Sequence, residues 1–376
     1  MSKELAILIQ SVRVVFLQQG EIELRALYGD VSINWQKLKE LCTYHRIRPV
    51  VAEAARLLDF QHPLIQRYAV FAREQSLLNL LCLKELETVL SAMKEQGIPA
   101  VPYKGMVFLQ KLYDGKSLRE SGDLDIVVDK TQGVATMLLL QKLGYTLKLS
   151  LPETEETFGK LVADAQGRQA TWCKQLPSGN SLHIDLHWGV NEEYHSYTIG
   201  TEDFFKGASL GVLTRTEVLL PSEAALFAMI INHNGGRECW TRLKDVVDLL
   251  VFTNKHPEFD GAEATKGYRM QKIFLQGKSL LDAFLKREKV PTALDQTFAR
   301  YWDEGSREWV LPKLRFVWLY KSMQDSPVST REIIQHFLAH FTSKYFKTDI
   351  YGYPFEGKYK VVNTLTQGLR KRYARP

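Results

Sequence analysis

Residues 101–128 of the chain are VPYKGMVFLQKLYDGKSLRESGDLDIVV. This stretch contains an apolar segment that predicts a strand ending at Lys104, then a helical segment, and then a second strand over residues 123–128. Successive side chains of a strand point to opposite faces, so Asp123 and Asp125 share one face of this second strand. Two carboxylates about 7 Å apart along a strand repel each other unless a cation lies between them. Oxygen ligands in this arrangement suit a hard ion such as Mg²⁺.

A third acidic residue occurs on a later predicted strand, SLHIDLHW at residues 181–188. The alternation of this strand places His183, Asp185 and His187 on one face. Two acids on one strand and a third on a neighbouring strand would form a cage for one or two Mg²⁺ ions bound to a triphosphate. Asp185 then either takes the proton of an attacking hydroxyl or serves only as a metal ligand. Zinc held by the two histidines is the weaker interpretation, because the neighbouring acids favour Mg²⁺.

Four sequence features occur in a fixed order along the chain. They are Lys104-Gly105, RESGDLD at residues 119–125, IDLHW at residues 184–188, and His233 followed by WTRLKDVVD at residues 240–248. Together they resemble the uncharacterised nucleotidyltransferases of the polymerase-beta-like superfamily, over roughly residues 30–255. The resemblance implies an NTP substrate and Mg²⁺, with a catalytic and metal-binding set made of Asp123, Asp125 and Asp185.

The phosphate-binding residues are matched less closely than the acids. The wider superfamily carries a Gly-Ser pair before the carboxylates, whereas Met106 follows Gly105 in this chain. Lys104 precedes a glycine and a helix N-terminus, where a cation and backbone amides would converge on a phosphate. The candidate nucleotide contacts are Lys104, Gly105, Arg119, Ser121, His187 and Lys244. The last of these is four residues from Asp248 on a predicted helix, so a surface salt bridge between the two is an alternative role.

The periodicity predicts an α+β fold, a small mixed β-sheet nucleotidyltransferase core flanked by N-terminal and C-terminal helical regions. The predicted parts are a helical subdomain over 1–97, the core over 98–215, a helical region over 216–355 and a basic tail over 356–376. In the core, a turn signal at residues 177–180 joins two predicted antiparallel strands, 169–175 and 181–188. The predicted helical stretches of the two flanking regions are 35–58, in which Pro49 starts a new helix, 64–96, 221–231, 240–252, 268–287, 292–302, 309–323 and 330–344, with a loop over 255–267.

Composition narrows the class of protein. The 376 residues are 45% hydrophobic and 24% charged, as in ordinary globular proteins, and no uncharged apolar run has the length of a membrane span. The four cysteines form no CxxC pair, so we expect a reduced, cytoplasmic protein without disulfides. Phosphate loops of the GxxxxGK[ST] type and GxGxxG fingerprints are both absent, which disfavours P-loop and Rossmann enzymes.

The net charge of +6 is concentrated at the C-terminal end. Residues 356–376 hold six basic residues and one acid, which gives +5 for the tail and leaves +1 for the rest of the chain. Such a tail either contacts nucleic acid or is a solvated terminus.

We expect a Mg²⁺-dependent nucleotidyltransferase that moves an NMP group from an NTP to an acceptor hydroxyl. The acceptor would be a small molecule, an RNA end or a protein side chain. The alternative is a catalytically inactive nucleotidyltransferase-fold protein that binds RNA through its basic tail.

Overall fold

A computed structural model of the chain describes residues 1–149, 151–164, 167–176, 179, 181–191, 198–213, 215–305, 323, 325, 329 and 331. The predicted helices over 309–323 and 330–344 and the basic tail lie outside the described residues, apart from these isolated positions. None of the helices in the described part has both the length and the hydrophobicity to cross a membrane. All four cysteines are free.

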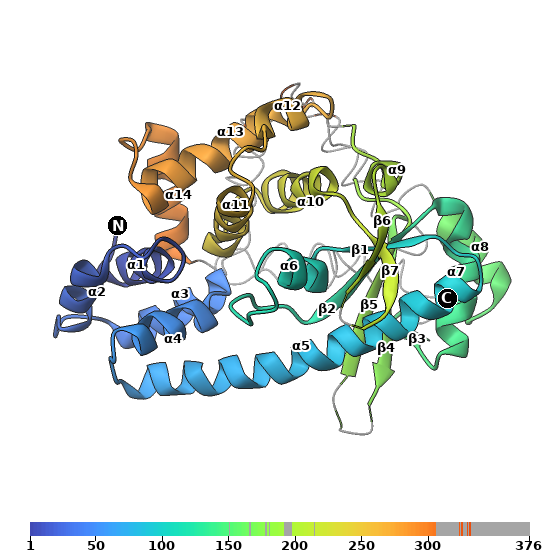
Figure 1. Cartoon of the computed structure of the whole chain (residues 1–376), viewed down its shortest axis with the longest axis horizontal. Helices are drawn as coiled ribbons and strands as arrows, with labels where there is room; N and C mark the ends of the chain where they lie inside the picture. Colours follow the sequence, from blue (N-terminus) through green and yellow to red (C-terminus); the bar gives the residue numbers. More distant parts are fainter. Residues whose placement is uncertain are drawn as a thin grey trace, which may run out of the picture.

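The N-terminal region is built of helices, as predicted. Its elements are α1 Lys3–Leu17, α2 Glu21–Tyr28, α3 Trp35–His45, α4 Arg48–Leu57 and α5 Pro63–Glu95. Proline at the first helical position suits the start of α5, and Gly97, with φ +69°, follows its end. This helix runs below the rest of the molecule and connects the N-terminal helices to the sheet (Figure 1).

The middle region alternates strands and helices. Its elements are β1 Ala100–Tyr103, α6 Gly105–Lys111, β2 Asp123–Val128, the 3₁₀ turn Lys130–Gln132, α7 Gly133–Lys142, β3 Thr146–Leu147, α8 Glu155–Ala163, β4 Gln169–Gln175, β5 Ser181–His187, α9 Thr201–Phe205, β6 Ser209–Val212 and β7 Glu217–Leu220. Five strands form one mixed sheet in the order β1-β2-β5-β4-β3, and β6 and β7 form a separate antiparallel pair.

The C-terminal described region is helical, with two stretches of π-helix. Its elements are α10 Glu223–Ile230, the π-helix Ile231–Arg237, α11 Leu243–Lys255, α12 Gly261–Lys266, α13 Gln271–Leu280, the π-helix Leu281–Lys286 and α14 Ala293–Glu304. These helices lie on the opposite side of α6 from α5 (Figure 1). The predicted fold class, a small mixed sheet flanked by helical regions, is confirmed.

The register of the sheet is what matters for the site. Strands β2 and β5 pair in parallel, with Asp125 opposite Asp185, and β4 and β5 pair antiparallel, with Thr171 opposite Asp185. The apolar residues of β2 and β5 are buried, because both strands lie inside the five-stranded sheet. The parallel pairing therefore fixes two acids side by side.

Some boundaries differ from the prediction. The helix predicted from Trp240 begins at Leu243, because Cys239 and Trp240 have positive φ angles and α11 starts only after them. Helix α12 lies within the predicted loop over 255–267, where the Asp260 carboxylate accepts hydrogen bonds from the first amides of the helix. The β6–β7 pair was not predicted.

Candidate active site

The centre of the candidate site is a pair of acids on neighbouring strands. Asp125 is 5% exposed and Asp185 is half-buried. Together with His187 they form a group whose possible ligand atoms all lie within 4.8 Å of one another. Burial, and then the charge of Asp125, raise the pKa of Asp185. These ligand atoms are close enough together to contact one ion, which makes the group a possible metal site.

Two nitrogen groups contact Asp125. Lys104 Nζ lies 3.0 Å from Asp125 Oδ1, and His187 Nε2 lies 2.9 Å from the same oxygen. Burial, and then the nearby Lys104, lower the pKa of His187 well below its usual value, so its imidazole is neutral. A neutral imidazole next to a carboxylate donates its N–H to that carboxylate. His187 Nε2 therefore orients Asp125 and has no lone pair directed at the acids.

The backbone at Lys104-Gly105 is shaped by its neighbours. Lys104 has φ +56° and ψ −139°, a region that non-glycine residues rarely adopt, and Gly105 has φ +29°. A Cβ atom on Gly105 would lie 3.0 Å from the carbonyl oxygen of Asp123 and 3.3 Å from Ser121 Oγ. Glycine is required here because the start of α6 passes directly against the strand that carries the acids.

Asp185 has a single side-chain donor among the described residues, the hydroxyl of Thr171, whose Oγ1 lies 2.6 Å from Oδ1. Its other lone pairs face a cavity. Asp123 is exposed at the edge of the same cavity and lies outside the group of close ligand atoms. The structure thus brings together Asp125 and Asp185 of the predicted three-acid cage and places Asp123 beside them.

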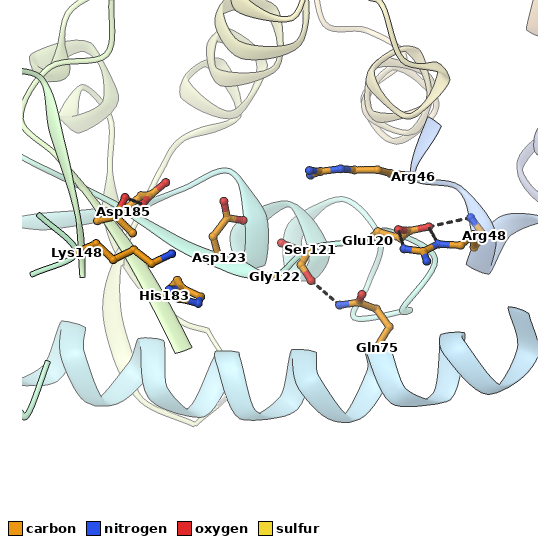
Figure 2. Close-up of a pocket in the computed structure, with 11 residues that line it drawn as sticks. Arg46, Arg48, Gln75, Glu120, Ser121, Gly122, Asp123, Lys148, His183 and Asp185 are labelled. Carbon is orange, nitrogen blue, oxygen red and sulfur yellow. Dashed lines mark hydrogen bonds and ion pairs between the residues drawn. The ribbon is translucent and has the colours of Figure 1, made fainter. Parts of the chain in front are cut away.

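Two cavities meet at these acids. One, which we call the basic cavity, has a volume of about 230 Å³ and is lined among the described residues by six cationic side chains, Arg46, Lys104, Arg119, Arg237, Arg242 and Lys244. The other, which we call the Lys148 cavity, has a volume of about 530 Å³ and is shown in Figure 2. Asp123, Asp185 and Ser121 line both cavities. The acids are therefore accessible from two sides.

Arg119 is already bound by a protein carboxylate. Its Nε and Nη2 lie 2.9 and 3.3 Å from the two carboxylate oxygens of Asp248, which is fully buried. Tyr113 Oη and Asn234 Nδ2 also donate to Asp248, at 2.7 and 3.0 Å. Burial opposes ionisation of Asp248, but Arg119, and then Lys244, hold its pKa below the usual value. Arg119 lines the basic cavity, and its role as a phosphate contact stays a prediction.

The alternative of a surface salt bridge between Lys244 and Asp248 is wrong. Both residues are buried, and Lys244 pairs with Asp245 at 3.3 Å, because Arg119 takes Asp248. Burial lowers the pKa of Lys244. Lys244 lines the basic cavity, and its predicted contact with the nucleotide stays a prediction.

Sequence reasoning missed several residues around the cavities. Arg46 comes from the junction of α3 and α4, and Arg237 from the π-helix after α10; neither guanidinium has an ion pair with a described residue. Thr171 could have been found, because the turn signal in the sequence at 177–180 predicts an antiparallel pair of strands, and in that pair Thr171 lies opposite Asp185. No sequence signal pointed to the two arginines, which tertiary packing places at the acids.

Comparison with known families supplies the class of the protein. Residues 31–285, more than half of the chain, match the family model described as "Uncharacterised nucleotidyltransferase". The chain belongs to this family. Membership implies an NTP ligand, and the matched range contains both acids, the cations of the basic cavity and the Arg119–Asp248 pair. None of the curated proteins compared with the chain matches it.

Proposed function

We propose that this chain is a metal-dependent enzyme that transfers an NMP group from an NTP to an acceptor hydroxyl. The observation that supports it most is the pairing of Asp125 with Asp185 across parallel strands, where two carboxylates meet beside a cavity lined by cations. A family of nucleotidyltransferases supplies the class of reaction. The acids and cations are what that reaction needs: oxygen ligands for a metal ion and positive charge for a triphosphate.

The side chains present fit a hard divalent ion. Asp125 and Asp185 offer carboxylate oxygens, Asp123 offers a third carboxylate at the cavity edge, and the His187 Nε2–H points to Asp125. Oxygen donors of this kind favour Mg²⁺ over zinc. When bound, such an ion would draw negative charge from the α-phosphate and from the leaving pyrophosphate.

The residues of the basic cavity would hold the triphosphate. Arg46 and Arg237 have no carboxylate partner among the described residues, so their charge is available to phosphate oxygens. Lys104 would exchange its contact with Asp125 for a phosphate oxygen as the ligand enters. With the triphosphate held in this way, we expect its α-phosphate to lie near Asp185, which lines the same cavity.

The transfer step balances with the groups at hand. The hydroxyl oxygen of the acceptor forms a bond to the α-phosphorus, the bond from this phosphorus to the β-phosphate oxygen breaks, and pyrophosphate leaves. The hydroxyl proton passes to Asp185, whose second oxygen has no donor among the described residues, whereas Asp125 is held by Lys104 and His187.

The test is pyrophosphate release from each of the four NTPs, with Mg²⁺ and with EDTA, together with calorimetric NTP binding. The wild type is expected to bind at least one NTP only with Mg²⁺ and to release pyrophosphate slowly with water as acceptor. Asp185→Asn should abolish the release. The matched control is Asp59→Asn, because Asp59 is an exposed acid on the turn after α4. Equal release by the wild type and Asp185→Asn, or metal-independent binding, contradicts the proposal.

A further inference from the structure

The Lys148 cavity has no role in the function proposed above. It lies above α5, beside the start of β2 at Asp123 and the part of β5 that carries His183 and Asp185 (Figure 2), and Lys104 is not among its lining residues. Lys148, His183 and Gln75 line this cavity and not the basic cavity. Its volume of about 530 Å³ falls within the range of small-molecule sites. A second substrate could therefore reach Asp185 while a nucleotide occupies the basic cavity.

The charges of this cavity divide into paired and unpaired groups. Arg48 and Glu120 neutralise each other, with Arg48 Nη2 2.6 Å and Nε 3.0 Å from the carboxylate. Lys148 and Arg46 have no ion pair with a described residue, and both extend over the cavity in Figure 2. Asp123 adds one negative charge to the lining. With a divalent ion on Asp185 and Asp125, the lining keeps a net charge of +1, from Arg46, Arg48 and Lys148 against Glu120 and Asp123. Arg46 also lines the basic cavity, so Lys148 is the unpaired cation of the described lining that belongs to this cavity alone.

Two polar atoms of the lining also lack partners. Ser121 Oγ and His183 Nδ1 are buried and have no hydrogen bond to any described residue, although buried polar atoms are nearly always satisfied. No Phe, Tyr or Trp side chain of the described residues lines the cavity, so it offers no stacking platform of the kind that binds the bases of a nucleic acid. Hydrogen-bonding and cationic groups with no stacking surface suit a small polar anion.

We propose that the Lys148 cavity is the acceptor site, and that the acceptor is a small hydroxylated molecule that carries a phosphate or carboxylate group. The inference rests on the proposed function. Lys148 binds the anionic group of the acceptor, and Ser121 and His183 bind the acceptor's other polar atoms. The acceptor hydroxyl lies at Asp185, which receives its proton as the oxygen bonds to the α-phosphorus and pyrophosphate leaves.

The test uses three compounds with one carbon framework: glycerol 3-phosphate, glycerate and glycerol. Each is titrated calorimetrically into protein saturated with Mg²⁺ and an NTP analogue whose α–β bridging oxygen is replaced by methylene. The two anions are expected to bind at least tenfold more tightly than glycerol, because one charge-assisted hydrogen bond is lost with the neutral compound. Comparison of the two anions tells a phosphate acceptor from a carboxylate acceptor.

Variants separate the two cavities. Lys148→Met should weaken anion binding at least tenfold and leave the affinity for the NTP analogue unchanged. Arg237 lines the basic cavity, so Arg237→Met should weaken binding of the NTP analogue and leave anion binding unchanged. Lys142→Met removes an exposed lysine at the end of α7 and is the matched control, expected to change neither.

Three results would overturn the inference alone: equal binding of the three compounds, no binding of any of them, or a Lys148→Met variant that loses the analogue instead of the anion. An analogue that fails to bind the wild-type protein contradicts the proposed function, and this inference with it.

Discussion

Two carboxylates differ in how completely their oxygens are bound: Asp248, which binds Arg119 of the basic cavity, and Asp185, which lines that cavity. Asp248 accepts four hydrogen bonds, from Arg119, Tyr113 and Asn234, and no part of it is exposed. Asp185 has one side-chain donor among the described residues and faces two cavities. We call Asp248 with its three donor residues the closed cluster, and Asp185 with Asp125 the open cluster.

The difference between the two clusters indicates which buried carboxylate stabilises the fold and which one binds a ligand. A buried carboxylate whose oxygens are all bound is costly to disturb, because removing one partner leaves an uncompensated charge. A carboxylate with free lone pairs beside a cavity is unstable by itself and is stabilised by a ligand. The closed cluster also positions the open one, since Arg119 precedes β2 by four residues and Asp248 lies on α11.

The largest expected effect comes from removing the charge of the open cluster. Asp185→Asn should lower Mg²⁺-dependent turnover about 10³-fold, which corresponds to roughly 4 kcal/mol of transition-state stabilisation. The free energy of unfolding should not decrease, because burial and Asp125 already oppose the charge of Asp185. Steady-state kinetics and urea unfolding measure the two quantities. If Asp185→Asn lowered both the free energy of unfolding and the turnover, Asp185 would stabilise the fold in the way that Asp248 does.

The closed cluster should respond in the opposite way. Asp248→Leu leaves the Arg119 guanidinium buried without a counter-charge and should lower the free energy of unfolding by about 3–5 kcal/mol. The double variant Asp248→Leu/Arg119→Met should regain part of this loss, because no charge is then left unpaired. Urea unfolding of the single and double variants checks both. A loss under about 1 kcal/mol in the single variant would contradict the closed assignment.

A third buried polar residue, His45, makes the stability of the fold depend on pH. His45 is fully buried; its Nδ1 accepts from the Leu243 amide at 2.9 Å, and its Nε2 lies 3.0 Å from the Trp302 carbonyl oxygen. Burial lowers its pKa to about 4. As the pH falls, the His45 imidazole of the unfolded chain is therefore protonated first, near the usual histidine pKa of about 6.5.

With respect to His45, the free energy of unfolding is therefore highest above pH about 6.5. It falls by up to about 3 kcal/mol as the pH is lowered from about 6.5 to about 4, because only the unfolded chain binds the proton in this range. Urea unfolding across this range measures the loss, and His45→Gln should reduce the slope. The same slope in the variant would show that other groups cause it.

The smallest expected effect concerns Lys104, which contacts the open cluster. Lys104→Met removes a cation that competes with a metal ion for Asp125, so Mn²⁺ binding without nucleotide should tighten, by up to about tenfold. NTP binding should weaken, since a phosphate contact is lost. Calorimetry with Mn²⁺ alone checks the sign. Weaker Mn²⁺ binding would mean that Lys104 supports the ion site instead of competing for it.

The sequence predicted the parts of the site that depend on local pattern. The alternation in β2 and β5 identified Asp125 and Asp185, and the hairpin turn at 177–180 predicted the pairing of β4 with β5. The contact of β2 with β5 joins strands far apart in the chain; the acids suggested that the two strands are neighbours, but no local pattern predicted that they pair in parallel. Arg46 was not predictable, because its position depends on how the N-terminal helices pack against the core.

The same limit applies to the partners of charged residues. Spacing on the helix paired Lys244 with Asp248, but Asp248 binds Arg119, which lies more than a hundred residues earlier in the sequence. Spacing along a helix describes only neighbours on that helix, whereas a buried carboxylate binds whichever cation the fold brings to it.

The metal site at Asp125 and Asp185 is tested by Mn²⁺ binding in the presence of a saturating NTP, measured by electron paramagnetic resonance. We expect one or two tightly bound ions in the wild type, loss of this binding in Asp125→Asn and Asp185→Asn, and unchanged binding in the Asp59→Asn control. Mn²⁺ binding that is unaltered in both open-cluster variants would contradict the account, because the metal would then lie elsewhere.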